Sequence, residues 1–237
     1  MAKGNNSSND ILLRECADDS DNLFADKSIH SIGRFFLKNV QALEALRNFW
    51  KGRGPATLAD FQLYNRPMRR DMKRWMKKVL SRASIHGLKE DKVVGTILES
   101  TVWHALLDRD PTLRMCRNVV VELDGRLIPP SNERGPNVDI GVDLVLAKRR
   151  LELYECKCSV STLWENGTPT KQLDLLGNLP KFLSDRLSGL RCAVVTWSSH
   201  VKCQVEMSGM KLPDQVELIA LEEIRSLSSD GKTRGTS

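Results

Sequence analysis

The chain has 237 residues, of which 41% are hydrophobic and 28% are charged, and its formal net charge is +6. This length suits one sizeable domain with or without an extension, and the composition is ordinary for a globular protein. No apolar run approaches the roughly 20 residues that span a bilayer, and the N-terminus lacks the apolar core of a signal peptide. We therefore expect an intracellular, cytoplasmic protein with no membrane span, in which the six cysteines are free thiols.

The N-terminal part of the chain divides into two segments. Residues 1–22 are rich in Ser, Asn and Asp, and we predict that they are disordered. Residues 23–90 form a predicted basic helical region, with apolar spacing that indicates a helix over 28–51. Between Arg66 and Arg82 the chain has eight basic residues and one acid. We predict that this second helix binds nucleic acid, the alternatives being an anionic membrane or a protein groove, through Arg69, Arg70, Lys73, Arg74, Lys77 and Lys78.

From residue 91 the pattern of the chain changes. The segment KVVGTILESTVWHALLDRD has apolar residues at helical spacing, and RNVVVEL, DIGVDLVLA and LELYECKC read as strands. A helix over TKQLDLLGNLPKFLSDRLSG, interrupted before its proline, and a strand over LRCAVVTW follow, and DQVELIALEEIRSLSS reads as a strand running into a helix. This order predicts an α/β domain over residues 91–227 with a mixed sheet flanked by helices, followed by a disordered tail over 228–237.

The segment VDLVLAKRRLELYECKC reads as a hairpin with one carboxylate in each strand. A three-residue loop over 148–150 would place Asp143 opposite Glu155, and Lys157 opposite Gly141 on the same side. Two facing carboxylates need a cation or a shared proton, and Mg²⁺ suits such a pair. The alternatives are a polar face neutralised by the lysine, or a two-residue loop that separates the acids. Asp139 is a rival for the first acid that has no facing partner in the predicted register.

An acid followed after a short hairpin by ECK resembles the signature of the PD-(D/E)xK nuclease superfamily, which has the restriction-endonuclease-like fold. The core of that family runs helix, three strands, helix, strand, and its first helix usually carries a glutamate, here Glu99. Three segments are similar to the nuclease domain of CRISPR-associated, ring-nucleotide-activated effectors. They are VGTILESTVW, TKQLDLLGNLPKFL and the following LRCAVVTWS. The resemblance covers residues 91–199. Residues 1–90 differ from the sensor domain of those effectors, so the resemblance does not imply cyclic-nucleotide activation.

The resemblance implies a hydrolase that cleaves phosphodiester bonds with bound Mg²⁺ or Mn²⁺. Asp143, Glu155 and the backbone carbonyl of Cys156 would hold the metal ion, and Glu99 would complete its ligand shell directly or through water. Lys157 would orient the attacking water or stabilise charge in the transition state.

The helix that follows the hairpin adds two candidate contacts to the phosphate backbone, Lys171 and Gln172. The expected partner is nucleic acid, DNA in preference to RNA, and a homodimer is compatible with the sequence. Two other classes stay open. One is a non-cleaving nucleic-acid-binding or assembly protein on a nuclease-like scaffold, and the other is a basic adaptor that binds a membrane or a protein.

Overall fold

A computed structural model describes residues 11–18, 20–40, 42–43, 90–128, 136–144 and 149–229, with four single positions between 70 and 87. Most of the predicted basic helix lies outside the described residues, including Arg69, Lys73, Lys77 and Lys78. Arg70 and Arg74 are described, and both are helical and exposed. The predicted disorder of residues 1–10 and 230–237 also falls outside the described part.

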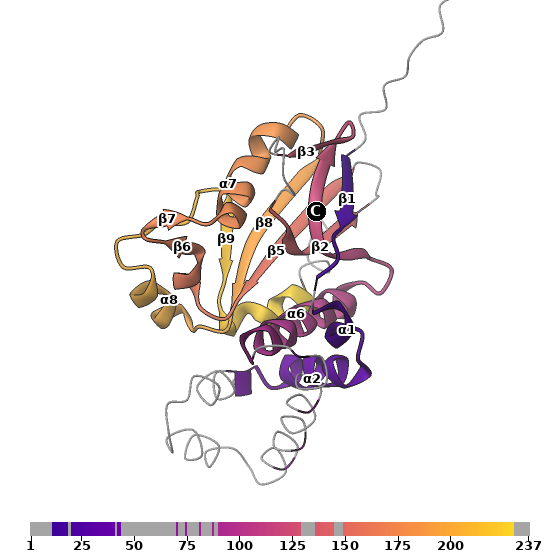
Figure 1. Cartoon of the computed structure of the whole chain (residues 1–237), viewed down its shortest axis with the longest axis vertical. Coiled ribbons are helices and arrows are strands. Elements are labelled where there is room, and N and C mark those ends of the chain that lie inside the picture. Colours follow the sequence, from indigo (N-terminus) through magenta and orange to yellow (C-terminus); the bar gives the residue numbers. More distant parts are fainter. Residues whose placement is uncertain are drawn as a thin grey trace, which may run out of the picture.

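The described residues fold around one mixed sheet with the strand order β1-β2-β4-β5-β8-β9, and β3 pairs with β2 (Figure 1). Neighbouring strands from β1 to β5 are antiparallel, whereas β8 is parallel to β5 and to β9. A small separate ribbon is formed by β6 and β7. The strands are β1 (Ile11–Glu15), β2 (Arg114–Leu123), β3 (Arg126–Ile128), β4 (Val138–Leu144), β5 (Arg150–Lys157), β6 (Trp164–Glu165), β7 (Thr168–Pro169), β8 (Gly189–Thr196) and β9 (Val216–Ile219).

Helices cover both faces of this sheet, and each face has its own hydrophobic core. The helices on one face are α1 (Asp21–Phe24), α2 (Lys27–Lys38), α6 (Glu90–Arg109) and the 3-10 helix η2 (Leu221–Ser228) (Figure 1). Those on the other face are η1 (Val160–Leu163), α7 (Lys171–Leu183) and α8 (His200–Glu206). The prediction of an α/β protein with a mixed, helix-flanked sheet is therefore confirmed.

Helix α6 is buried on most sides because it lies between the sheet, α2 and η2. Its apolar residues, such as Leu98 and Val102, pack into the core, and its buried hydroxyls are satisfied by backbone carbonyls. Ser100 Oγ, for example, donates to the Ile29 carbonyl of α2 at 3.2 Å. At this crossing a side chain on Gly33 would collide with the Ser100 backbone, so the two helices touch directly. Such packing fixes the orientation of the polar face of α6.

The N-terminal predictions need two corrections. Residues 11–15 form the edge strand β1 and are not disordered, because Ile11 and Leu13 alternate into the core next to β2. Helix α2, in the predicted 23–90 region, and helix α6, in the predicted 91–227 domain, share one hydrophobic core. Helix α2 also ends at Lys38, inside the predicted 28–51 helix.

Smaller expectations had mixed outcomes. Helix α7 is continuous through Pro180, and the predicted final helix is the 3-10 helix η2. None of the six cysteines, all of which lie in the described part of the chain, forms a disulfide. None of the helices in the described part of the chain is both long enough and apolar enough to cross a membrane.

Candidate functional site

The register of the β4–β5 hairpin differs from the predicted one. Asp143 pairs with Leu151, and Leu144 pairs with Arg150, so five residues separate the last paired positions. Asp143 therefore lies four residues along the ladder from Glu155, roughly 13 Å at the usual rise of a strand. The prediction that these two acids face each other is wrong. The parallel ladder with β8, which runs from Arg150 to the end of β5, fixes where β5 begins.

Asp143 is engaged at the closed end of the hairpin. Arg149 donates to both of its carboxylate oxygens, with Nε–Oδ1 at 3.0 Å and Nη2–Oδ2 at 2.6 Å. The expected space beside Gly141 is also absent, since a side chain there would meet Val119 Cγ2 at 2.8 Å and Leu13 Cδ1 at 3.0 Å. This end of the hairpin is therefore built for stability, and Asp143 does not reach the other acids.

Asp139 occupies the position that the sequence assigned to Asp143. The β4–β5 ladder stops at the Ile140–Tyr154 pair, which brings Asp139 level with Glu155. Asp139 Oδ2 accepts a hydrogen bond from the Cys156 backbone N–H at 2.7 Å. Beyond the end of the β4–β5 ladder, the Asp139 carboxylate thus accepts the hydrogen bond from the Cys156 N–H, where a backbone carbonyl would otherwise accept it.

The neighbouring strand β2 is continuous but distorted at the same level. Asn118 has a φ of 47° and leaves the ladder, although Arg117 and Val119 on either side remain paired with β4. A left-handed conformation is rare for residues other than glycine, and Asn is among those that tolerate it best. The β2–β4 pairing therefore has a gap at Asn118, and both Asn118 and Asp139 line the pocket described next.

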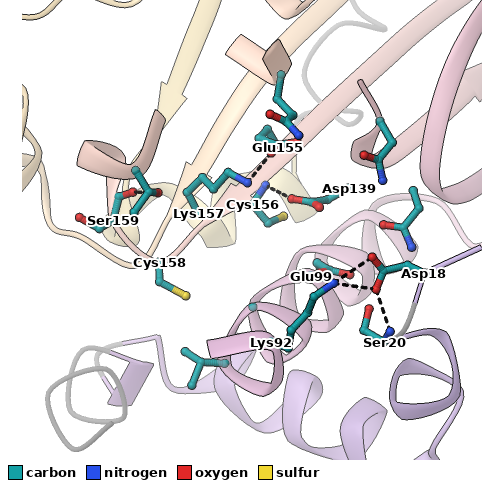
Figure 2. A pocket seen from close by; sticks show the side chains of 16 residues that line it. Asp18, Ser20, Lys92, Glu99, Asp139, Glu155, Cys156, Lys157, Cys158 and Ser159 are labelled. Atoms are coloured by element: carbon teal, nitrogen blue, oxygen red, sulfur yellow. Dashed lines mark hydrogen bonds and ion pairs between the residues drawn. The ribbon is translucent and has the colours of Figure 1, made fainter. Parts of the chain in front are cut away.

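The pocket at this gap has a volume of about 670 Å³ and is shown in Figure 2. Its walls come from the β1–α1 connection, from α6, from β4 and β5, and from the start of α7. It therefore reaches elements on both faces of the sheet. Its polar lining residues are Asp18, Ser20, Lys92, Glu99, Asn118, Asn137, Asp139, Glu155, Lys157, Ser159, Thr162 and Gln172.

Glu155 is the most buried acid in the pocket, with 1% of its surface exposed. Its Oε1 lies 2.6 Å from Lys157 Nζ, whereas its Oε2 has no hydrogen-bond partner among the described residues (Figure 2). Burial and repulsion by Asp139 raise the pKa of Glu155 to about 8, although Lys157 opposes the shift. Burial lowers the pKa of Lys157, but attraction to Glu155 and Asp139 outweighs it and raises that pKa.

Two further acids in the pocket are also difficult to ionise. Burial and repulsion by Asp139 raise the pKa of Glu99 to about 7, against the attraction of Arg117. Arg117 Nε donates to Glu99 at 3.1 Å, and its guanidinium also contacts Asp21 and lies over the Phe24 ring. Burial raises the pKa of Asp139, and Lys157 opposes that shift. Three carboxyl groups therefore lie in one buried place with too few cations to neutralise them.

A second buried glutamate on β5 shows what a satisfied carboxylate looks like in this fold. Glu152 is bound by Arg109 at 3.3 and 2.7 Å and accepts a hydrogen bond from Tyr154 Oη at 2.7 Å. Both of its oxygens have partners, as is typical of a buried charge with a structural role. Glu155 lies three residues further along and lacks such a set, which distinguishes a candidate ligand from a structural acid.

The pocket has the donor chemistry of a site for a hard divalent cation. Mg²⁺ binds carboxylate oxygens and keeps several other oxygen ligands, such as water and phosphate. In the described part of the chain, no three His, Cys, Asp or Glu side chains form a group arranged to hold a metal ion. The unpartnered, buried Glu155 Oε2 is nevertheless an oxygen that such an ion would satisfy, with Asp139 beside it.

The structure brings together most of the predicted site. Glu99, Glu155, Cys156, Lys157 and Gln172 line the pocket, whereas Asp143 does not and Lys171 is exposed outside it. Sequence reasoning missed Asp18, Ser20, Lys92, Asn118 and Asn137. Asp18 and Ser20 fall in the segment predicted to be disordered. No sequence pattern singles out Asn118, a left-handed residue within β2, or Asn137, which directly precedes β4.

Comparison with known proteins finds no match: no protein-family model fits the chain, and no curated protein resembles it in sequence.

Proposed function

We propose that the protein is a metal-dependent nuclease that hydrolyses phosphodiester bonds in nucleic acid. Asp139 and Glu155 hold the divalent cation with help from the Cys156 carbonyl, Glu99 completes the shell, and Lys157 acts on the water or the phosphate. The observation that carries the proposal is the unpartnered Glu155 Oε2, buried between Asp139 and Lys157 in an open pocket. A fold that needed only stability would be better served by an apolar or a fully paired side chain here.

Each residue has a task that follows from its surroundings. Asp139 and Glu155 repel each other, and this repulsion is relieved when both bind one cation. Bound Mg²⁺ or Mn²⁺ supplies Lewis-acid chemistry, lowering the pKa of water and neutralising phosphate charge. The Lys157 ammonium ion, already directed at the same acids, is held where charge develops on the phosphate. Arg117 holds Glu99 in place from the side of the pocket nearer α1.

The order of elements supports the same reading. Apart from the short strand β3 and the short elements η1, β6 and β7, helix α6 is followed by β2, β4 and β5 and then by α7 and β8, which is the order of the restriction-endonuclease-like core. Glu99 lies on α6, the first helix of this core. Asp139 lies on β4, and the Glu-x-Lys motif ends β5. When Asp139 takes the role predicted for Asp143, all three residues of the motif, Asp139, Glu155 and Lys157, line one pocket.

Nucleic acid is the substrate class that the charge of the chain favours. The net charge is +6, and the excess basic residues gather in one predicted helix. Gln172, at the first turn of α7, lines the pocket and offers amide donors to a phosphate. Phosphate contacts dominate the affinity of proteins for nucleic acid. DNA is the first substrate to test and RNA the second.

The test is a cleavage panel of single-stranded, double-stranded and branched DNA and of RNA, with Mg²⁺, Mn²⁺ or EDTA. Asp139→Asn is compared with Asp143→Asn, since both change one acid of β4 to its amide. We expect EDTA and Asp139→Asn to abolish cleavage and Asp143→Asn to retain it. Circular dichroism checks that both variants fold.

Two outcomes would overturn the proposal. If Asp139→Asn folds and cleaves like the wild type, the pocket is not the active site. If no substrate is cleaved, but nucleic acid is bound in a salt-dependent way that EDTA does not change, the protein is the non-cleaving binding protein described above.

A further inference from the structure

Three glycines lie inside helices of the described chain, and two of them have a packing reason. A Cβ on Gly33 would strike the Ser100 backbone at 2.8 Å, and one on Gly177 would lie 2.8 Å from Pro213 Cγ. A Cβ on Gly95 in α6 would have no atom within 4 Å. Glycine weakens a helix interior relative to alanine, so nothing in the fold itself accounts for Gly95.

Gly95 lies on the face of α6 that lines the pocket. Lys92, Gly95 and Glu99 are separated by three and four residues, so they share one side of the helix, and all three line the pocket. Lys92 is two turns from Glu99, roughly 10 Å along the axis. Its side chain is 46% exposed, and its Nζ donates to both oxygens of Asp18 at 2.9 and 3.1 Å (Figure 2). Bare helix backbone therefore lies between an acid of the site and a positioned cation.

The charges of the pocket show why this cation matters to an anionic ligand. Four carboxylates line the pocket, from Asp18, Glu99, Asp139 and Glu155, against two ammonium groups, from Lys92 and Lys157. Both lysines contact an acid, but the Lys92 side chain is 46% exposed and that of Lys157 is 28% exposed, so Lys92 is the lysine of the pocket nearer solvent. The buried, unpartnered Glu155 Oε2 in the same pocket indicates that the pocket receives a ligand, beginning with the cation.

We propose that the surface of α6 over Gly95 is the subsite for the backbone of the substrate strand next to the scissile phosphate. The missing side chain lets the strand lie against the helix, and Lys92, held by Asp18, binds the neighbouring phosphate. This subsite rests on the proposed nuclease function and adds to it the path of the strand, from the acids toward the N-terminus of α6.

The subsite makes Gly95→Ala an unusual variant, because stability and function should change in opposite directions. Alanine fits the open space and strengthens the helix, so the midpoint of thermal unfolding should rise by up to about 2–4 °C. The added methyl group lies in the path of the strand, so the KM for cleavage should rise at least about tenfold. Gly95→Leu should weaken binding further while the protein stays folded.

The matched control is Asp108→Ala, in the last turn of the same helix. Asp108 is exposed and does not line the pocket. Removing an acid near the C-terminus of a helix should also raise the unfolding midpoint, without changing KM. A further variant, Lys92→Gln, should reduce the slope of log Kobs against log salt by about 0.7 for a single strand, the loss of one phosphate contact.

Binding is measured with short fluorescein-labelled oligothymidylate and oligouridylate, in Ca²⁺ to suppress turnover, and cleavage in Mg²⁺. If the wild type cleaves but Gly95→Ala keeps the wild-type KM and Kd, the subsite is wrong and the nuclease function stands. If the wild type binds without cleaving and Gly95→Ala binds more weakly, the nuclease function is wrong, and what stands is a strand-binding surface over Gly95 without a scissile phosphate. Failure of the wild type both to bind and to cleave would overturn both.

Discussion

The two ends of the β4–β5 hairpin carry similar residues and have different surroundings. At the closed end, Asp143 is bound by Arg149 through two hydrogen bonds. At the open end, Asp139 bonds the Cys156 N–H, while Glu155 and Lys157 project into a pocket of about 670 Å³. Both ends pair acids with a cation, but only the open end leaves a buried carboxylate oxygen without a partner. An acid is therefore a candidate metal ligand because of its hydrogen-bond partners and its access to the pocket, and not because it lies on a strand.

The two ends should differ most in kcat when the basic residue at each end, Lys157 or Arg149, is replaced by alanine. Lys157→Ala should lower kcat by about 10²–10³-fold, because it removes a preorganised charge next to the reacting phosphate. Arg149→Ala should leave kcat within about twofold, since Arg149 contacts Asp143 outside the pocket. Steady-state cleavage of the best substrate measures both. Equal losses in the two variants would contradict the assignment of the active site to the open end.

The open end should also bind metal in a pH-dependent way. The pKa of Glu155 is raised to about 8 and that of Glu99 to about 7, so protons compete with the cation over this range. We expect the affinity for Mn²⁺ to weaken by about tenfold for each pH unit below 8 and to level off above it. Isothermal titration at several pH values checks this, with Asp143→Asn as a control of unchanged profile. A flat profile between pH 6 and 8 would argue against Glu155 as a ligand.

In the absence of metal, the free energy of unfolding should change with pH in a direction set by Glu155. The folded-state pKa of Glu155, about 8, is above its ordinary value of 4.5, so the folded state binds the proton more tightly. Its contribution to stability is therefore full below about pH 4.5 and is lost as the pH rises through about 8.

The variant Glu155→Gln removes this loss and should be more stable than the wild type at pH 9 in EDTA. We expect a gain on the order of 1–3 kcal/mol, with about 2–4 °C in the unfolding midpoint for each kcal/mol. At pH 5 the gain should be small. Thermal unfolding followed by circular dichroism measures it, and a gain that shrinks as the pH rises would contradict the buried, repelled carboxylate.

The smallest expected effect belongs to the closed end. Asp143→Asn leaves a hydrogen-bond acceptor but removes the charge that Arg149 binds, and both side chains are partly exposed. The free energy of unfolding should fall by about 1 kcal/mol or less. Denaturant titration measures it, and 0.5 M salt should narrow the difference because it screens the pair. A loss of several kcal/mol would mean that this pair, and not the β5–β8 ladder, holds the register.

The class of fold could be predicted from periodicity because the elements are long and regular. The α6 pattern, the apolar runs of β4 and β5 and the α7 pattern all correspond to observed elements. The edge strand β1 was missed because five residues of strand lie in a segment whose composition is typical of disorder. A short edge strand gains its stability from its neighbour β2 and has no strong local signal.

The candidate site was predicted in part, for a reason that lies in the geometry of sheets. Four residues of the predicted site, Glu99, Glu155, Lys157 and Gln172, line one pocket. Asp143 was preferred to Asp139 because the loop was taken as three residues instead of five. A slip of four residues leaves every side chain on its original face, so the alternation of apolar and polar residues fits both registers equally well.

The kinds of elements, their order, and the presence of acids and a lysine on one hairpin could be read from the amino-acid sequence alone. This is possible because helix and strand periods are local properties of the chain. Which aspartate lies level with Glu155 depends on the tertiary structure, through the β5–β8 ladder and the gap in the β2–β4 pairing at Asn118. Both depend on contacts between residues far apart in the chain, and such contacts leave no period in the sequence.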